Sequence, residues 1–368
     1  MTAPALGSAC PLPLSAFPPA LQKSLDPTGP LPARMMAAKG ILLAGPRDFL
    51  TALFALTFDP DPTVALTARQ SAPKTQDKVL TGLRDDELHP LVLDFFAQAL
   101  AGQETYLELI ALNPAAADGT MARLAATGSD RIVEIVAQNQ LRILRDERIV
   151  RALVQNPATR PATRDSVLDF CVRSGLWLAD LPELALARRR LLGDDPAEAQ
   201  KLAEAEANSA ERVLQEFGPR LTDDDGQVEE AQRLTFTQRV LKMSVSQKIK
   251  LATLGNKEAR SLLLRDSNKL VALAAVQSPR ITDGEIAALA NSRTLHEELM
   301  RFITHNREWL KNYQVKVSLV NNPKTPLAVA LKLLPHLHGN DVKTVARNRN
   351  IPSAVQTQAR KLVMTKEH

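Results

Sequence analysis

Short turn signals interrupt the apolar helical pattern of this chain at nearly regular intervals. In the first half the turns contain Ser71, Asn113 and Asn156, which lie 42 and 43 residues apart, and in the second half Ser278 and Asn322 lie 44 residues apart. Short helices of such a repeat cannot bury their apolar faces alone and must stack on their neighbours. The pattern therefore predicts an all-α chain that forms an α-solenoid.

Composition supports helices over sheets. Only 4% of the residues are aromatic, 45% are hydrophobic, and leucine and alanine are abundant. Because β-sheets favour aromatic and β-branched side chains, we expect a core of small and aliphatic residues between packed helices. A chain of 368 residues is also long enough for two domains.

Four segments follow from the local pattern. Residues 1–33 predict a disordered leader, because so many prolines leave too few donors for a helix or a sheet. Residues 34–187 predict an N-terminal arm of helical repeats. Residues 188–232 are rich in alanine and acids and predict an exposed helix flanked by linkers, and residues 233–365 predict a second, basic repeat arm. The prolines of the leader are Pro4, Pro11, Pro13, Pro18, Pro19, Pro27, Pro30 and Pro32.

The two predicted arms echo each other directly. The stretch "ILRDERIVRALVQNPATR" begins at Ile143, and "LLRDSNKLVALAAVQSPRIT" begins at Leu263. Both contain Leu-Arg-Asp from their second residue, continue as an apolar helix and then contain Val-Gln followed by Asn-Pro or Ser-Pro. We interpret the arms as two parts of one repeat family, joined by the acidic segment.

The turn in "LVNNPKTPLAVALKLL" explains how one helix ends and the next begins. We expect Asn322 to end its helix in the left-handed conformation, and Pro323 cannot continue that helix. Thr325 is expected to cap the next helix with its hydroxyl, and Pro326 to occupy the first helical position. Of this turn, only Lys324 is left for binding.

The Asn-Pro-x-Thr turns at 156–159 and 322–325, each before a leucine-rich short helix, resemble those of HEAT/armadillo-like repeats and in particular the bacterial leucine-rich repeat variant. The stretch "KIKLATLGNKEARSLLLRDSNKLVALAAVQSPRIT" is similar to a functionally uncharacterised segment of bacterial helical-repeat proteins. The resemblance covers residues 245–363 well and residues 65–175 loosely, and it implies a right-handed superhelix with a role in binding. Some leucine-rich repeat variant proteins hold an iron–sulfur cluster on N-terminal cysteines; this chain lacks such a cysteine cluster, so no cofactor is expected.

Charge is distributed unevenly along the chain. The formal net charge is +5, but residues 232–368 contain 23 Lys and Arg against 9 Asp and Glu, a net charge of +14. The corresponding net charge is −7 for residues 181–231 and −2 for residues 1–180. A strongly basic arm favours RNA, DNA, the ribosome, anionic lipid or an acidic protein as a partner. Alternatively, the cations solvate the repeat surface or neutralise the acidic segment.

Cations near the predicted turns and one aromatic pair are the candidate partner- or anion-binding residues. Trp309 and Tyr313 have helical i, i+4 spacing, which suits stacking on bases or anchoring a protein interface. Alternatively, both rings fill the junction between repeats. The candidate set is Lys257, Arg260, Arg265, Lys269, Arg307, Trp309, Lys311, Tyr313, Lys324, Arg347 and Arg349.

The sequence predicts no catalytic residue and no metal site. His296, His305, His336 and His338 do not have metal-ligand spacing. The sequence has no P-loop, no glycine-rich dinucleotide motif after a strand and no nucleophile elbow. The two cysteines, Cys10 and Cys171, are too few for a disulfide framework. No apolar stretch reaches the roughly 20 residues of a membrane span.

We therefore expect a cytoplasmic, non-enzymatic scaffold that binds a partner protein along its surface. The first alternative is a nucleic-acid- or ribosome-binding protein that acts through the basic arm. The second is an enzyme of HEAT-like fold that processes DNA bases, which requires an acid in a basic cleft beside an exposed aromatic ring.

Overall fold

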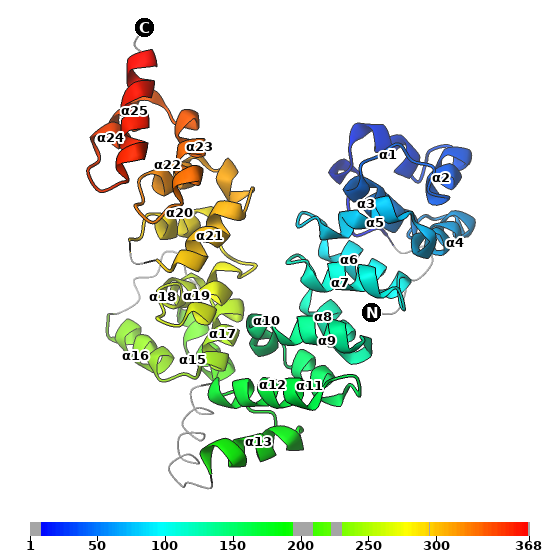
Figure 1. Cartoon of the computed structure of the whole chain (residues 1–368), viewed down its shortest axis with the longest axis horizontal. Helices are drawn as coiled ribbons and strands as arrows, with labels where there is room; N and C mark the ends of the chain where they lie inside the picture. The colour runs from blue at the N-terminus through cyan, green and yellow to red at the C-terminus, as the bar shows by residue number, and fades with distance from the viewer. Residues whose placement is uncertain (1–8, 194–208, 222–229, 294, 367–368) are drawn as a thin grey trace. The chain divides into compact units, whose positions relative to one another are not determined.

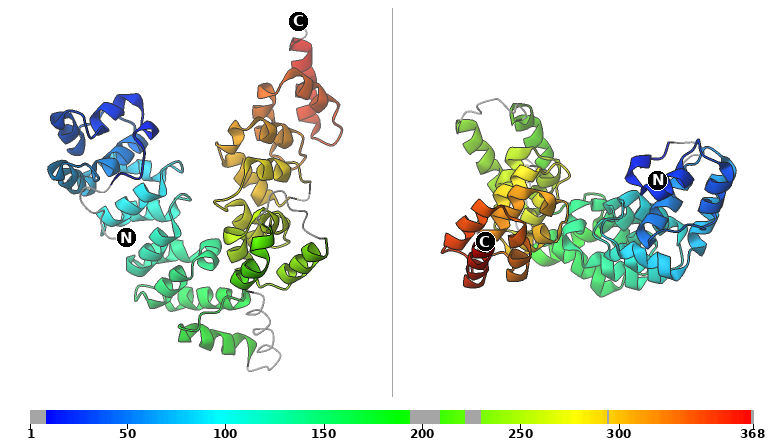
Figure 2. Two further views of the ribbon diagram at one scale, coloured as in Figure 1. Left: turned by 180° about the vertical axis from the view of Figure 1, so that it is seen from behind. Right: turned by 90° about the horizontal axis from the view of Figure 1, so that it is seen from above.

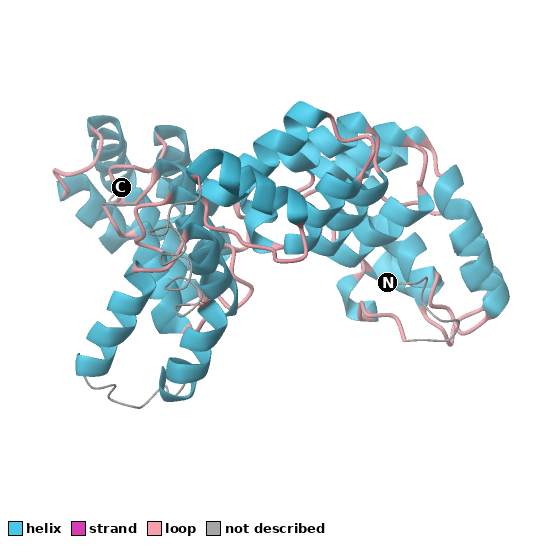
Figure 3. Ribbon diagram, turned by 90° about the horizontal axis from the view of Figure 1, so that it is seen from below, coloured by secondary structure: helices cyan, strands magenta, loops and turns pink. Residues whose placement is uncertain are grey.

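The computed structural model of the chain is built from helices. It describes residues 9–193, 209–221, 230–293 and 295–366, and over these ranges it contains α-helices and short 3₁₀ helices (labelled η) but no β-strand (Figure 3). The prediction of an all-α fold is confirmed. None of the helices in these ranges combines the length and the apolar character that crossing a bilayer requires.

Two compact units divide the chain, and each is described on its own. Unit 1 comprises the described residues of Met1–Phe170 and Leu178–Ala187, and unit 2 comprises those of Cys171–Trp177 and Arg188–His368. Within each unit, helices that are close along the chain pack against each other, so the colours of Figure 1 follow one another in order. The views of Figure 2 show the same order from two other sides.

Unit 1 contains most of the helices before residue 193, and two of these helices, α12 and α13, cross its boundaries. Its elements are η1 (Leu14–Ala16), α1 (Pro19–Leu25), α2 (Leu31–Ala38), α3 (Pro46–Leu56), α4 (Pro62–Ser71), η2 (Ala72–Lys74), α5 (Asp77–Leu80), η3 (Thr81–Arg84), α6 (Pro90–Ala99), α7 (Glu104–Leu112), α8 (Asp118–Thr127), α9 (Asp130–Ala137), α10 (Gln140–Arg145), α11 (Glu147–Gln155), α12 (Pro161–Arg173) and α13 (Pro182–Leu192).

Unit 2 contains the remaining helices. They are α15 (Ala210–Leu221), α16 (Glu230–Leu241), α17 (Val245–Leu254), α18 (Lys257–Leu263), α19 (Lys269–Val276), α20 (Asp283–Ala290), α21 (Glu297–His305), η4 (Trp309–Lys311), α22 (Tyr313–Val320), α23 (Leu327–Leu333), η5 (Leu334–His336), α24 (Gly339–Arg347) and α25 (Ser353–Lys366).

Small and aliphatic side chains fill the core of each unit, as the composition predicted. Leu53 and Leu93 are fully buried in unit 1, and Val271, Leu299 and Val315 are fully buried in unit 2. Because each helix is short, it contributes only a few such residues. The apolar surface of each unit is therefore buried by many pairs of neighbouring helices.

The proline-rich start of the chain is not the disordered leader that we expected. The described residues 9–33 contain η1, α1 and the beginning of α2, and Phe17, Leu21 and Leu25 are buried. Pro19 is the first residue of α1, and Pro30 directly precedes α2. Proline is compatible with these positions because the first turn of a helix leaves its N–H groups without intrahelical partners. The prediction for residues 9–33 is therefore wrong, and residues 1–8 lie outside the described ranges.

The acidic segment, residues 188–232, contains a helix that is less exposed than predicted. Ala210 and Val213 of α15 are fully buried, and α15 packs against α17. Glu216 also forms an ion pair with Arg239 of α16, at 3.0 Å. This helix therefore belongs to unit 2, and one acid of the segment neutralises a cation of the basic arm. Residues 194–208 and 222–229, expected as linkers and helix, lie outside the described ranges.

The asparagine of the Asn-Pro turn after α11 joins two helices. The side-chain amide of Asn156 donates hydrogen bonds to the carbonyl oxygens of Ala125 (2.8 Å) and Gly128 (3.0 Å), where α8 ends. Its side-chain oxygen accepts a hydrogen bond from the backbone N–H of Ala158 at 2.8 Å. The last carbonyls of a helix lack intrahelical donors, and this buried amide supplies them from 28 and 31 residues further along the chain.

Two other turns use the same contact. Asn113 follows α7 and bonds to carbonyls at and just beyond the end of η3, and Asn322 follows α22 and bonds to carbonyls at and just beyond the end of α20. In each case the helix before the asparagine packs against the helix that accepts the bonds. The acceptor carbonyls are those of Leu83 and Asp85 for Asn113 and of Ala290 and Ser292 for Asn322, at distances of 2.6–2.9 Å.

The turn at 322–326 differs in detail from its predicted conformation. No described residue other than glycine has a positive φ, so Asn322 acts through its side chain and not through a left-handed backbone. The Thr325 hydroxyl does not cap α23 but donates to the carbonyl oxygen of Leu319, at 2.6 Å, and Pro326 precedes α23. The hydroxyl thus gives this buried carbonyl near the end of α22 a second donor, beside the backbone N–H of Asn322 at 3.1 Å. Thr159 makes the same backward contact in unit 1.

Ser278 occupies the matching position after α19 but has a different environment. Helix α19 packs against α17 as α11 packs against α8. Helices α8 and α17 are both ten residues long and end at glycines, Gly128 and Gly255. Ser278 is only 3% exposed, and its hydroxyl has no hydrogen-bond partner within the ranges that the structure describes.

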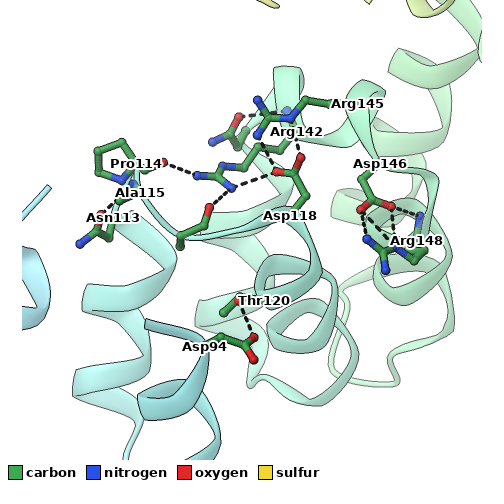
Figure 4. Close-up of polar contacts among 12 residues, drawn as sticks. Asp94, Asn113, Pro114, Ala115, Asp118, Thr120, Arg142, Arg145, Asp146 and Arg148 are labelled. Carbon is green, nitrogen blue, oxygen red and sulfur yellow. Dashed lines mark hydrogen bonds and ion pairs between the residues drawn. The ribbon is translucent and has the colours of Figure 1, made fainter. Parts of the chain in front are cut away.

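A buried arginine connects α10 to the turn before α8 in unit 1. The Arg142 guanidinium donates to the carbonyl oxygens of Pro114 (2.8 Å) and Ala116 (2.5 Å) and forms an ion pair with Asp118 at 3.0 Å (Figure 4). Burial lowers the pKa of Arg142, and the Asp118 carboxylate opposes this shift. Arg145 binds the same carboxylate, with distances of 2.5 and 2.6 Å. These two cations hold helices together and are not available to a partner.

Candidate functional site

A pocket in unit 2 is the best candidate for a functional site among the described residues. It lies beside α18 and α20 and the turns that follow them, and it has a volume of about 630 Å³. This size falls in the range of about 300–1,000 Å³ that is typical of ligand pockets. The residues that line it are Lys257, Ser261, Leu264, Arg265, Asp266, Ser267, Thr282, Gly284, Glu285, Ala288, Leu289, Ser292, Leu295 and His296.

Two of the predicted binding cations meet at this pocket. Lys257 is the first residue of α18, and Arg265 lies in the turn after it; both side chains are exposed. Neither has an acidic partner among the described residues of unit 2. The sequence placed both near turns but gave no indication that they share one pocket, because that depends on the packing of α18 against its neighbours.

The acids of the pocket are already neutralised by other residues. Asp266 forms an ion pair with Lys248 at 2.8 Å, and Glu285 forms one with Arg260 at 3.0 Å. The imidazole Nε2 of His296 lies 3.2 Å from the carbonyl oxygen of Asp266, which restrains the ring. The excess charge on the pocket wall is therefore that of Lys257 and Arg265.

Arg260 is not a binding residue, and the prediction for it is wrong. Its side chain is 5% exposed and donates to both carboxylate oxygens of Glu285, at 3.0 and 3.1 Å, and to the carbonyl of Gly255, at 3.1 Å. Burial alone would raise the pKa of Glu285, but hydrogen bonds from Arg260 and Thr282 outweigh it and lower the pKa. Arg260 satisfies the end of α17 and the buried acid of α20, so it has a structural role.

Three predicted lysines remain exposed but have partners. Lys269 pairs with Glu298 at 3.2 Å, and Lys311 pairs with Glu308 at 2.5 Å. Exposed pairs of this kind contribute about 0–1 kcal/mol and separate easily. Lys324 donates through Nζ to the carbonyl oxygen of Leu295, at 2.7 Å, and therefore lies near the pocket wall.

The two predicted aromatic residues do not share a helix. Trp309 belongs to η4 and packs edge-on against Phe302, with ring centroids 5.7 Å apart, whereas Tyr313 begins α22. The Tyr313 hydroxyl donates to Asp341, and the ring lies 4.3 Å from that of His338. The prediction that the two rings lie one helical turn apart on a single helix is therefore wrong, because a turn of the chain separates η4 from α22. Both rings are half-buried against neighbouring segments.

The remaining predicted cations are Arg307, Arg347 and Arg349. All three are exposed, and none of them lines the pocket. Arg347 ends α24, and Arg349 lies in the turn that follows. Arg347 and Arg349, which are close in sequence and lie outside the pocket lining, offer a comparison for the pocket.

The pocket lacks the features that base processing requires. No phenylalanine, tyrosine or tryptophan is among its described lining residues, and both of its carboxylates are bound to cations. Elsewhere in the described ranges no group of three or more His, Cys, Asp or Glu is arranged to hold a metal ion. Burial raises the pKa of the Cys171 thiol to about 12 and also raises that of Cys10, so neither favours a reactive thiolate at neutral pH. The arrangement is suited to binding.

Comparisons with protein-family models, with curated proteins and with solved structures found no match to this chain.

Proposed function

We propose that this protein is a non-enzymatic scaffold of the α-solenoid type, with turns like those of the leucine-rich repeat variant. Two observations support the solenoid. Short helices pack in chain order within each unit, and the asparagine contacts recur between helices whose bonded residues are 28–32 positions apart. A chain of nearest-neighbour contacts is the arrangement expected of stacked repeats.

The partner that we propose is an acidic segment of another protein, bound by unit 2. The observation that carries this proposal is the pair of cations at the pocket, Lys257 and Arg265, which have no acidic partner among the described residues although several neighbouring cations do. Unpaired cations on a concave surface attract anionic groups and favour rapid, salt-sensitive association.

Nucleic acid and the ribosome are the alternative partners, and the geometry favours them less. A nucleic-acid site needs a row of cations that follows the phosphates. In unit 2 Arg260 is buried in an ion pair, and Lys269 and Lys311 are bound to carboxylates. The pocket wall also contains two carboxylates of its own.

Capture experiments with the full-length chain test the proposal. Nuclease-treated extract is passed over the protein and over a variant in which Lys257, Arg265, Arg347 and Arg349 are replaced by glutamate. A stoichiometric protein partner should bind the wild type and be lost with this variant.

A matched control has the same change in charge but places it in unit 1. It replaces Lys39, Lys74, Lys78 and Arg84, all of which are exposed, by glutamate, and the partner should be retained. Capture that disappears after nuclease treatment, together with binding of mixed RNA and DNA oligonucleotides that falls steeply with salt, would refute a protein partner and support the nucleic-acid alternative.

A further inference from the structure

The pocket of unit 2 has a cationic rim and an aliphatic wall, and we infer that it binds an acidic side chain and an adjacent aliphatic side chain from an extended segment of a partner. The inference rests on the proposed function and names the kind of ligand for that site. Its occupant is thus a short acidic–aliphatic peptide motif.

The charged half of the ligand follows from the ion pairs around the pocket. Asp266 and Glu285 each have a cation partner, which leaves Lys257 and Arg265 as the charges that attract a ligand. A carboxylate is suited to this pair, since an arginine can bind both of its oxygens and a lysine adds a point charge.

The corresponding arginine of unit 1 shows what is missing at Arg265. In the shared Leu-Arg-Asp sequence, Arg145 binds Asp118, the first residue of α8. Helix α17 has the same length as α8 and also ends at a glycine, but its first residue is Val245. In unit 1 the acid that pairs with Arg145 therefore comes from the same unit, at the start of α8. In unit 2 the matching helix starts with an apolar residue, so it offers Arg265 no such acid.

The apolar half of the ligand follows from the rest of the lining. Leu264, Leu289 and Leu295 contribute to the wall although each is at least 94% buried, so they form its deeper part. A volume of about 630 Å³ exceeds what one carboxylate fills. An aliphatic side chain that removes these surfaces from water would add hydrophobic binding free energy to the charge contact.

A carboxylate fits this pocket better than a phosphate does. A phosphate monoester carries a charge of about −1.5 to −2 at neutral pH, and the wall already contains the carboxylates of Asp266 and Glu285. Their ion pairs with Lys248 and Arg260 reduce the repulsion that they exert but do not abolish it at the wall, because neither of these cations lines the pocket, and the remaining repulsion grows with the charge of the ligand. We therefore expect glutamate or aspartate, and not phosphoserine, in the bound segment.

Fluorescence anisotropy with labelled octapeptides tests the inference on the full-length chain. The first probe has a central Glu-Leu pair in a Gly/Ser background, and the others replace the pair by Gln-Leu, Glu-Ser or phosphoserine-Leu. The Glu-Leu probe should bind saturably, and each of the other three should bind at least about tenfold more weakly, which corresponds to about 1.4 kcal/mol.

Two variants locate the binding. Lys257→Gln combined with Arg265→Gln should reduce the affinity for Glu-Leu to that of the Gln-Leu probe. Arg347→Gln combined with Arg349→Gln changes the charge of unit 2 equally and should have no effect. Tryptophan fluorescence during urea unfolding confirms that both variants fold.

Several results would overturn the assignment: no saturable binding of Glu-Leu, equal binding of Gln-Leu or Glu-Ser, tighter binding of phosphoserine-Leu, or an equal loss in the control variant. The proposed function can fail separately. If a captured partner is lost with the fourfold glutamate variant but retained by the pocket variant, the scaffold proposal stands and the pocket assignment is refuted.

Discussion

Replacing Ser278 by asparagine should stabilise unit 2. The serine hydroxyl is buried without a hydrogen-bond partner among the described residues, while asparagine at the matching position of three other turns bonds to the end of an earlier helix. In α17 the corresponding carbonyls are those of Ala252 and Gly255, by alignment of its terminal glycine with that of α8. The Gly255 carbonyl already accepts a hydrogen bond from Arg260 at 3.1 Å, so the asparagine amide would donate to its second lone pair. The substitution therefore tests whether the contacts of the asparagine turns are a transferable part of the repeat.

The expected gain is about 1–2 kcal/mol. A hydrogen bond formed on folding contributes about 0.5–1.5 kcal/mol net, and a buried unsatisfied polar group costs about 1–3 kcal/mol. Asn156 forms three such bonds, with two carbonyls and one backbone N–H. Fitting a larger side chain into a packed site costs about 1–3 kcal/mol, and we take the lower end because the turn already accepts asparagine elsewhere.

Tryptophan fluorescence provides an assay whose two probes both lie in unit 2. The chain has two tryptophans, Trp177 and Trp309, and both belong to unit 2. With a urea m-value of about 1–3 kcal/mol/M, the fluorescence midpoint of Ser278→Asn should rise by about 0.3–2 M. Asn322→Ser should lower the same midpoint, since it removes the amide from a matching turn of unit 2.

The reciprocal substitution in unit 1 is the control. Asn156→Ser should leave the tryptophan midpoint unchanged and lower the midpoint of unit 1 unfolding, followed by circular dichroism at 222 nm. If Ser278→Asn lowers the tryptophan midpoint or leaves it unchanged, the turn at 278 is not equivalent to the asparagine turns, and the reasoning from the shared contact is refuted.

Four further predictions concern other residues of unit 2 and use the same fluorescence assay. Arg260→Ala should lower the unfolding free energy by about 3–5 kcal/mol, because it leaves the Glu285 carboxylate buried without its cation. Folding lowers the pKa of Glu285, so this group stabilises the folded state fully above the ordinary glutamate pKa, and the stabilisation is lost as the pH falls through the lowered value. Glu285→Gln should therefore flatten the acid side of a plot of urea midpoint against pH. An unchanged plot would contradict this. Gly175→Ala should cost more than about 1 kcal/mol, because φ is +70° there and a Cβ would lie 2.6 Å from the Cβ of Ser244; a neutral effect would contradict that close approach. Lys257→Glu should raise the unfolding free energy slightly, by about 0.3–1 kcal/mol, since an acid is favoured in the first turn of α18. A variant that is stable but loses binding would separate the two roles of this position, and a lower midpoint would contradict the helix-dipole argument.

The sequence predicted the elements better than the contacts between them. Composition and apolar spacing predicted helices throughout, and the turns at Asn113, Asn156 and Asn322 do follow helices. The acceptors of their amides lie about 30 residues away, beyond the range of any local rule for turns, and we had assigned Asn322 a backbone role. The number of prolines led to the wrong prediction of disorder for residues 9–33, because the effect of a proline depends on its position relative to the start of a helix.

The candidate site shows the same limit. Lys257 and Arg265 were among the predicted residues, but so was Arg260, and spacing alone could not separate an exposed cation from one bound to a buried acid. One signal was present: Thr282 and Glu285 have the spacing of a capping box, which the structure contains, and the box brings a carboxylate to the start of α20. That carboxylate can then form an ion pair with an arginine of another helix, as Glu285 does with Arg260 of α18.

The short reach of the asparagine contacts has a consequence for how the protein is made. Each amide meets carbonyls that were synthesised only 28–32 residues earlier. At a synthesis rate of about 5–20 residues per second, the asparagine is added to the chain about 1.5–6 s after the carbonyls to which its side chain will bond. Loops of this length close in far less time than the ribosome needs to supply the residues. Each pair of helices can therefore be completed while the next is still being translated, so that the growing chain exposes at most about one unfinished repeat at a time.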